Sequence, residues 1–143
     1  MPTDQELQKT FSVSQEGERL IKLVILRGVS DVTSNIRQAE LVSQAMLAKL
    51  TADKKIDCLV DLSALGPSAH YPSPQARQIY SEIVNQPALD KIAVVAPQGI
   101  LRAIMRFVAA KMNGKKSIEF FKNQTEALAW LRGEAVNTIA RPE

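Results

Sequence analysis

The chain has 143 residues, of which 45% are hydrophobic and 23% charged, and 18 basic against 15 acidic side chains give a net charge of +3. This length fits one domain with a real core, and no stretch approaches the roughly 18 consecutive apolar residues of a membrane span. The charge is modest and dispersed, so nucleic-acid binding is not predicted. The start of the sequence has no apolar run behind a basic head, so no secretory signal is predicted and the cytoplasm is the expected compartment.

The first part of the chain predicts a hairpin followed by a helix. Residues 9–14 alternate polar and apolar side chains, as in a half-buried edge strand, and residues 19–27 are apolar on both faces, as in an inner strand. Gly17 supplies the positive φ of the turn between them. Asn35 and Gln38 have capping-box spacing and predict a helix that runs to about residue 50. The apolar stripe of this helix is Ile36, Ala39, Val42, Met46 and Leu50.

The rest of the chain predicts three strands that alternate with helices. The strands are residues 56–62, 91–96 and 117–121. The helices begin at Ser73 with Pro74, run over about 100–112, and extend from Asn123 through Leu131.

This order of elements predicts an α/β fold with a single-layer, five-stranded mixed sheet. The N-terminal hairpin is antiparallel, the later strands are parallel, and about four helices cover the sheet. We expect an N-terminal extension at residues 1–8, the domain itself at 9–132, and a flexible tail at 133–143.

Three stretches of the sequence resemble a known superfamily. They are LVDLS at 59–63, KIAVV at 91–95, and FFKN at 120–123 leading into EALAWL at 126–131. In this order they resemble the STAS superfamily, and more closely the small bacterial SpoIIAA-like domains often grouped with CRAL-TRIO-type lipid-binding proteins. The resemblance runs over about residues 9–132. It implies a STAS-like fold and a mostly non-enzymatic module that binds a partner protein, a nucleotide or an apolar molecule.

One motif of that superfamily is missing. Anti-sigma-factor antagonists carry Asp-Ser-(Ser/Thr)-Gly at the start of the helix after the central strand, where a kinase partner phosphorylates the serine. The corresponding loop here has no Asp-Ser pair. Ser73 is interpreted as a helix cap and Ser63 as the end of a strand. Ser68 is therefore the candidate phospho-acceptor, at a place where added charge beside a helix start would act as a switch.

Catalytic and metal chemistry have few candidates. One histidine, His70, and one cysteine, Cys58, cannot assemble a usual transition-metal site or an intrachain disulfide. Cys58 lies inside a strand and is interpreted as a small apolar core residue. Asp57 and Asp61 share a strand face but are ~13 Å apart, too far for a paired-carboxylate mechanism. We therefore expect no enzyme activity and no cofactor, and a structural or regulatory role for Asp61.

The loop of residues 63–73 is the predicted functional edge. It follows the central strand at the carboxyl end, where α/β sheets bind ligands, and it is longer than the usual strand-to-helix connection. The predicted binding residues are Asp61, Ser63, Ser68, His70, Tyr71, Gln98, Gly99 and Arg102. The helix start at Gly99 also suits an anion, although any helix offers this. A solvated connector would contain the same turn residues, so this alternative stays open.

Two functions follow from these patterns. The first is a protein-interaction module that uses this loop, and the second is a carrier or sensor of a lipid-like or other apolar molecule, with His70, Tyr71 and Tyr80 near its mouth. An enzyme acting on a phosphorylated or acyl substrate is a distant alternative. An apolar cavity of about 300 Å³ or more would favour the carrier, and a closed core the interaction module. The edge strand and exposed aromatic residues near 71 and 80 also predict a homodimer.

Overall fold

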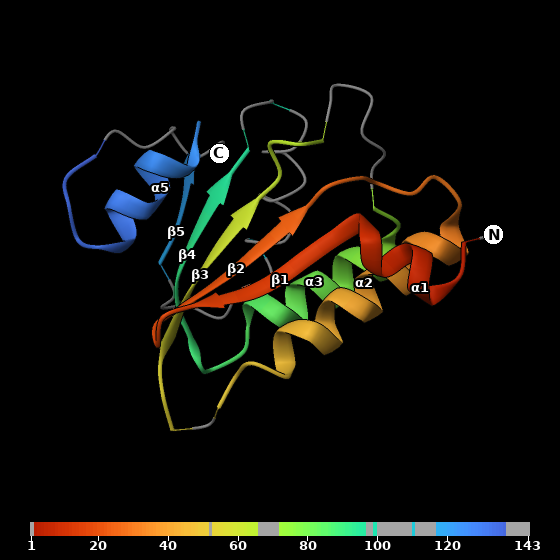
Figure 1. The fold of residues 1–143 in the computed structure, drawn as a ribbon, viewed down its shortest axis with the longest axis horizontal. Helices are drawn as coiled ribbons and strands as arrows, with labels where there is room; N and C mark the ends of the chain where they lie inside the picture. The colour runs from red at the N-terminus through yellow and green to blue at the C-terminus, as the bar shows by residue number, and fades with distance from the viewer. Residues whose placement is uncertain are drawn as a thin grey trace.

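A computed structural model gives the fold of the chain (Figure 1) and describes residues 2–51, 53–65, 72–96, 99, 110 and 117–136. The strands are β1 (Phe11–Glu16), β2 (Leu20–Ile25), β3 (Ile56–Asp61), β4 (Leu89–Val95) and β5 (Ser117–Phe121). The helices are α1 (Asp4–Leu7), the short 3-10 helix η1 (Gln8–Thr10), α2 (Val32–Leu47), α3 (Pro74–Val84) and α5 (Gln124–Leu131). The helix predicted at about 100–112 lies almost entirely outside the described residues.

The strands form one sheet in the order β1-β2-β3-β4-β5. β1 pairs antiparallel with β2, from Phe11 opposite Ile25 to Glu16 opposite Leu20, and each later pair is parallel. Gly17 has a φ of 68° in the hairpin turn. The predicted mixed sheet, with β1 at its edge, is therefore confirmed.

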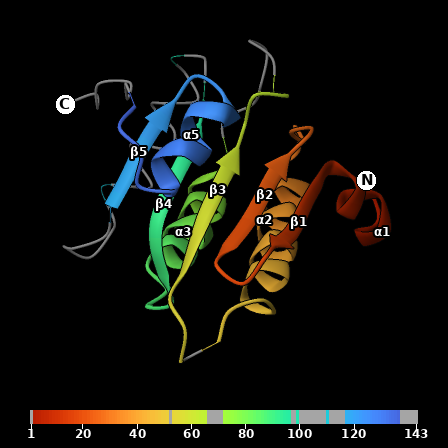
Figure 2. The same ribbon diagram turned by 60° about the vertical axis from the view of Figure 1, so that its left-hand side comes forward.

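Helices cover both faces of the sheet (Figure 2). Helices α2 and α3 pack side by side on one face, which we call the α2/α3 face, and α5 lies on the other, the α5 face, over β3, β4 and β5. Alternation along each strand divides the core accordingly. In β3, Cys58 and Val60 join the larger core cluster with α2 and α3, whereas Leu59 joins a smaller cluster with α5.

The start of α2 differs from the prediction. Asp31 is the N-cap, and its carboxylate accepts a hydrogen bond from the Ser34 N–H at 2.9 Å. A carboxylate suits this position because it also faces the positive end of the helix dipole. The capping-box prediction for Asn35 and Gln38 was wrong, since both lie within the helix and are 8% and 3% exposed. A spacing of three places two residues on the same helix face as readily as it forms a cap.

The N-terminal residues also contribute to the fold. Thr3 and Glu6 form a capping box for α1, and Leu7 is fully buried in the larger core cluster. The Arg37 guanidinium of α2 binds Asp4, with 2.7 Å between Nη2 and Oδ2. The edge strand begins at Phe11, later than predicted, because the residues before it form η1.

The remaining helix starts agree with the sequence. Ser73 caps α3 with Pro74 at its first position, and the Asn123 side chain caps α5 by accepting a hydrogen bond from the Glu126 N–H at 2.9 Å. None of the helices in the described ranges has the length and apolar character needed to cross a membrane.

Candidate functional site

Asp61 ends β3, and three hydrogen bonds hold its carboxylate. Oδ1 accepts from the Ser63 N–H at 2.9 Å and from the Ser63 hydroxyl at 2.6 Å, and Oδ2 accepts from the Gln124 side chain at the start of α5. Burial raises the pKa of this carboxyl, but the hydrogen bonds from Ser63 and Gln124 and the charge of Lys22 outweigh burial, so the pKa is lowered. Asp61 therefore stays charged at neutral pH and links the end of β3 to α5.

The loop predicted to be functional is anchored at both ends. At its start, Ser63 is bound to Asp61 through both its N–H and its hydroxyl. At its end, the Ser73 N–H donates to Asn35 Oδ1 of α2 at 2.8 Å. The Asn35 amide also donates to the Val29 carbonyl at 3.4 Å, which fixes the orientation of the side chain. Two side chains from different elements thus hold the two roots of the loop.

Only some of the predicted binding residues lie in the described part of the chain. Asp61 and Ser63 lie together at the carboxyl end of β3. Gly99 is described, and a methyl group there would meet no described atom within 4 Å, so crowding does not demand glycine. The other predicted residues, Ser68, His70, Tyr71, Gln98 and Arg102, lie outside the described residues. That these residues lie together at one edge of the sheet stays a prediction.

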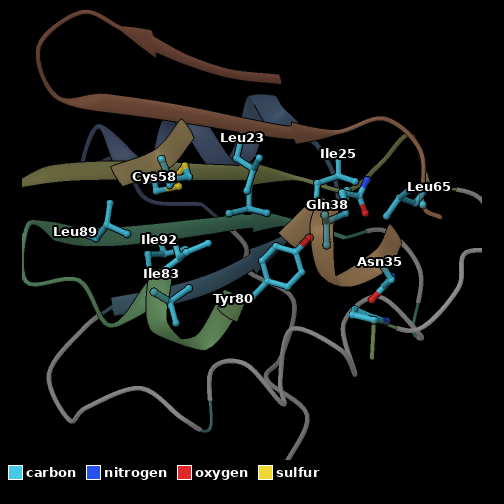
Figure 3. Close-up of a pocket in the computed structure, with 16 residues that line it drawn as sticks. Leu23, Ile25, Asn35, Gln38, Cys58, Leu65, Tyr80, Ile83, Leu89 and Ile92 are labelled. Carbon is cyan, nitrogen blue, oxygen red and sulfur yellow. The ribbon is translucent and has the colours of Figure 1, made fainter. Parts of the chain in front are cut away.

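A pocket lies between the sheet and helices α2 and α3 (Figure 3). Its volume is about 90 Å³, and its walls are mostly aliphatic side chains of β2, β3, β4 and α3. Leu65 and Pro72, which flank the undescribed part of the loop, also line it, as does Asn35. The pocket therefore adjoins both roots of the loop. Its volume is well below the ~300 Å³ at which a carrier would be favoured.

Tyr80 belongs to this pocket and not to an exposed surface. The prediction of an exposed aromatic side chain here was wrong, because the residue is half-buried and its ring projects from α3 into the pocket (Figure 3). Burial raises the pKa of its phenol, so the hydroxyl keeps its proton at neutral pH.

The surroundings of Cys58 and of Asp57, the other carboxylate of β3, are those of structural residues. Cys58 is 2% exposed, and burial raises the pKa of its thiol to about 12, which keeps it in the unreactive thiol form. Asp57 accepts a hydrogen bond from the Lys91 N–H at 3.1 Å, while burial raises the pKa of its carboxyl. Across the described part of the chain, no group of three or more histidine, cysteine or acidic side chains is placed to hold a metal ion.

Three residues of these networks were not predicted from the sequence. Gln124 reaches Asp61 from 63 residues away, and no local pattern indicates such a contact. Asn35 and Gln38 did carry a signal, because they are in phase with Val42 and Met46 on the buried side of α2. Polar residues in a helical core stripe indicate a hydrogen-bonded network within the core.

Comparison with known proteins gives one match. The family model described as SpoIIAA-like matches residues 26–132, which include the Asp61 network and most of the pocket. No curated protein and no solved structure matches. The matched segment covers well over half of the chain and agrees with the resemblance seen at residues 59–63, 91–95 and 120–131. The chain therefore belongs to the SpoIIAA-like family of STAS domains.

Proposed function

We propose that the chain is a non-enzymatic regulatory module that binds a protein partner through the loop of residues 63–73, in the cytoplasm expected from its sequence. Membership of the SpoIIAA-like family favours a binding or regulatory role. The observation that carries the proposal is the anchoring of both loop roots, by Asp61 on one side and Asn35 on the other.

Anchored roots matter because a loop that is ordered only on binding loses conformational entropy, which weakens the complex. The Asp61–Ser63 pair fixes the direction in which the chain leaves β3, and the Asn35–Ser73 bond fixes where it enters α3. A connector that only spans the gap between a strand and a helix needs neither side-chain anchor. The two anchors therefore support a recognition role for the segment between them.

The described chemistry favours binding over catalysis. Asp57 and Asp61 each accept hydrogen bonds from their own neighbours, and the Cys58 thiol is buried. No observation on the described residues favours an enzyme that acts on a phosphorylated or acyl substrate, so this stays the weakest of the three functions.

Site-specific photo-crosslinking tests the proposal. A photoreactive amino acid is placed at Ala64, an exposed residue at the start of the loop, and the full chain is irradiated in its host cell. We expect one discrete protein adduct from this position. Adding Asn35→Ala, which removes the anchor of the other root, should reduce the yield of that adduct.

The matched control is the same photoreactive group at Lys54, which is also exposed but precedes β3 at the opposite end of the strand. Adducts that form equally from Lys54, or only from there, would place the binding surface elsewhere.

The second candidate is a carrier or sensor of an apolar small molecule, and the pocket on the α2/α3 face favours it. At about 90 Å³ the pocket is smaller than the 150 Å³ cavity known to bind benzene. A long lipid chain would therefore need the helices to move apart. This volume is the reason that the interaction module ranks first.

A homodimer is also proposed, through the edge of the sheet. Among the described strands β1 pairs only with β2, and residues 11–15 contain no charge, proline or irregular pairing that would protect the edge. Lys9 precedes the strand and Glu16 ends it, so antiparallel pairing of two copies would bring opposite charges together. Light scattering at micromolar concentration should exceed the 15.7 kDa of one chain, and a value equal to it would contradict the proposal.

A further inference from the structure

The polar corner of the pocket is built around Gln38. Its Nε2 donates to Thr10 Oγ1 at 2.8 Å and to the Arg27 carbonyl at 2.9 Å. The Thr10 hydroxyl donates its own proton to the Leu7 carbonyl, so it can only accept from Gln38. Both partners of Nε2 are therefore acceptors, and this determines which end of the amide is nitrogen.

The amide oxygen of Gln38 is left with no donor among the described residues, although the side chain is 3% exposed and lines the pocket. The Tyr80 hydroxyl likewise has no hydrogen bond to any described residue. Figure 3 shows this hydroxyl directed toward the side of the pocket where Gln38 lies. Because Gln38 lines the pocket, its amide oxygen can accept a hydrogen bond from a ligand held there.

The described walls of the pocket offer no charge to a ligand. No lysine, arginine, histidine, aspartate or glutamate is among the described residues that line it. A carboxylate or phosphate would lose its hydration there without gaining a counter-charge, which is strongly unfavourable. Gln38 Oε1 accepts hydrogen bonds and cannot donate, so it also disfavours an anion. The head group that fits is neutral and carries an O–H or N–H.

We propose that this pocket binds a compact, neutral, apolar molecule with one hydrogen-bond donor, such as an alcohol, whose O–H donates to Gln38 Oε1 while the Tyr80 hydroxyl provides a second contact. The inference rests on the second candidate function, the carrier or sensor, and adds the class of ligand. The body of the ligand would lie against aliphatic side chains such as Leu23, Ile83 and Ile92.

Methyl NMR of the full chain tests this with three probes that share a five-membered ring: cyclopentanol, cyclopentane and cyclopentanecarboxylate. We expect cyclopentanol to shift the methyl signals of Leu23, Ile25 and Ile83 and to bind about three- to tenfold more tightly than cyclopentane, the gain expected of one neutral hydrogen bond. The carboxylate should leave these signals unchanged.

Tyr80→Phe sharpens the test because it removes only the hydroxyl. It should reduce the preference for cyclopentanol while leaving the affinity for cyclopentane unchanged. Gln38→Met should abolish the preference, but it also breaks the bonds to Thr10 and Arg27, so Tyr80→Phe stays decisive if that variant does not fold.

The outcomes distinguish a wrong ligand class from a wrong carrier function. Equal affinity for the alcohol and the hydrocarbon, or tighter binding of the carboxylate, would overturn the ligand class and leave the carrier candidate standing. If no probe shifts the pocket methyls, the carrier candidate and this inference both fall.

Discussion

The two faces of the sheet are built differently from the same strands. The α5 face buries a small, apolar cluster in which Phe121 packs on Trp130 at 5.6 Å between ring centroids, and Lys91 lies over the same indole at 5.4 Å. The α2/α3 face buries a larger cluster and has a pocket of about 90 Å³, which the buried polar residue Gln38 helps to line. The buried cluster of the α5 face is apolar, whereas polar groups lie beside unfilled space on the α2/α3 face. We therefore expect the α5 face to be the more closely packed of the two.

Side-chain size and polarity explain this difference. On the α5 face, Ala93 of β4 and Ala127 of α5 are both 0% exposed, so the helix can lie close to the sheet. On the other face, Asn35 and Gln38 use their hydrogen bonds on backbone and hydroxyl partners and do not fill the space between β2 and α3. We therefore expect substitutions on the α5 face to affect mainly stability, whereas the α2/α3 face carries the proposed ligand pocket.

The largest expected effect compares two leucines. Leu59→Ala on the α5 face should destabilise the fold by about 2–5 kcal/mol, because a completely buried side chain is removed from a packed site. Leu23→Ala on the α2/α3 face should cost less, since Leu23 already borders the pocket and has fewer contacts to lose. Urea unfolding of both variants measures the difference, and an equal or larger loss for Leu23→Ala would contradict the contrast between the faces.

A smaller effect is expected at Asp61, which faces α5. Asp61→Asn should cost about 1–3 kcal/mol at pH 7, because it replaces charge-assisted hydrogen bonds and sets the Asn N–H₂ against a donor of Gln124 or Ser63. The pKa of Asp61 is lowered in the fold, so its contribution is present above the usual carboxyl pKa of about 4 and is lost as the pH falls through the folded-state value.

The free energies of unfolding of the Asp61→Asn variant and the unsubstituted chain should therefore become more similar as the pH is lowered below about 4. Urea unfolding at several pH values measures this convergence. Asp53→Asn, at an exposed loop position, is the control for the loss of one negative charge. If the difference in free energy of unfolding between Asp61→Asn and the unsubstituted chain stays constant with pH, the charged form of Asp61 is not the source of the stabilisation.

The smallest effect is expected at Val60, which is compared with Val95 on the other face. Val60 lines the pocket, so Val60→Ile should be neutral or stabilising by about 0.5–1 kcal/mol, as expected when a cavity is filled. Val95 is 1% exposed on the α5 face, where an added methylene should cost about 1–3 kcal/mol. Thermal unfolding of both variants gives the sign of each change, and a stabilising Val95→Ile would show that the α5 face is not closely packed.

Much of the fold was predictable because the signals are local. The period-two pattern of β1, the turn at Gly17 and the helix starts at Ser73 and Asn123 each depend on a few adjacent residues, and the structure has all four. The family could be identified for the same reason, from short stretches at the strands and the last helix.

The contacts of the site were less predictable because they are not local. The Asp61 network joins β3 to α5, and the Asn35 anchor joins α2 to a loop 38 residues later. Asn35 and Gln38 were interpreted as a helix cap, although their phase with Val42 already placed them on the buried face. The pocket has no sequence signature at all, since an apolar helix face looks the same whether it packs fully or leaves space.

The position of the pocket beside both roots of the loop has a thermodynamic consequence. Asn35 lines the pocket and also holds the Ser73 N–H, and Leu65 and Pro72 are both pocket walls and residues of the loop. A molecule that shifts Asn35 would therefore act on the hydrogen bond that anchors the loop for the partner we propose. Free-energy coupling is reciprocal, so whatever factor the ligand imposes on the affinity for the partner, the partner must impose on the affinity for the ligand.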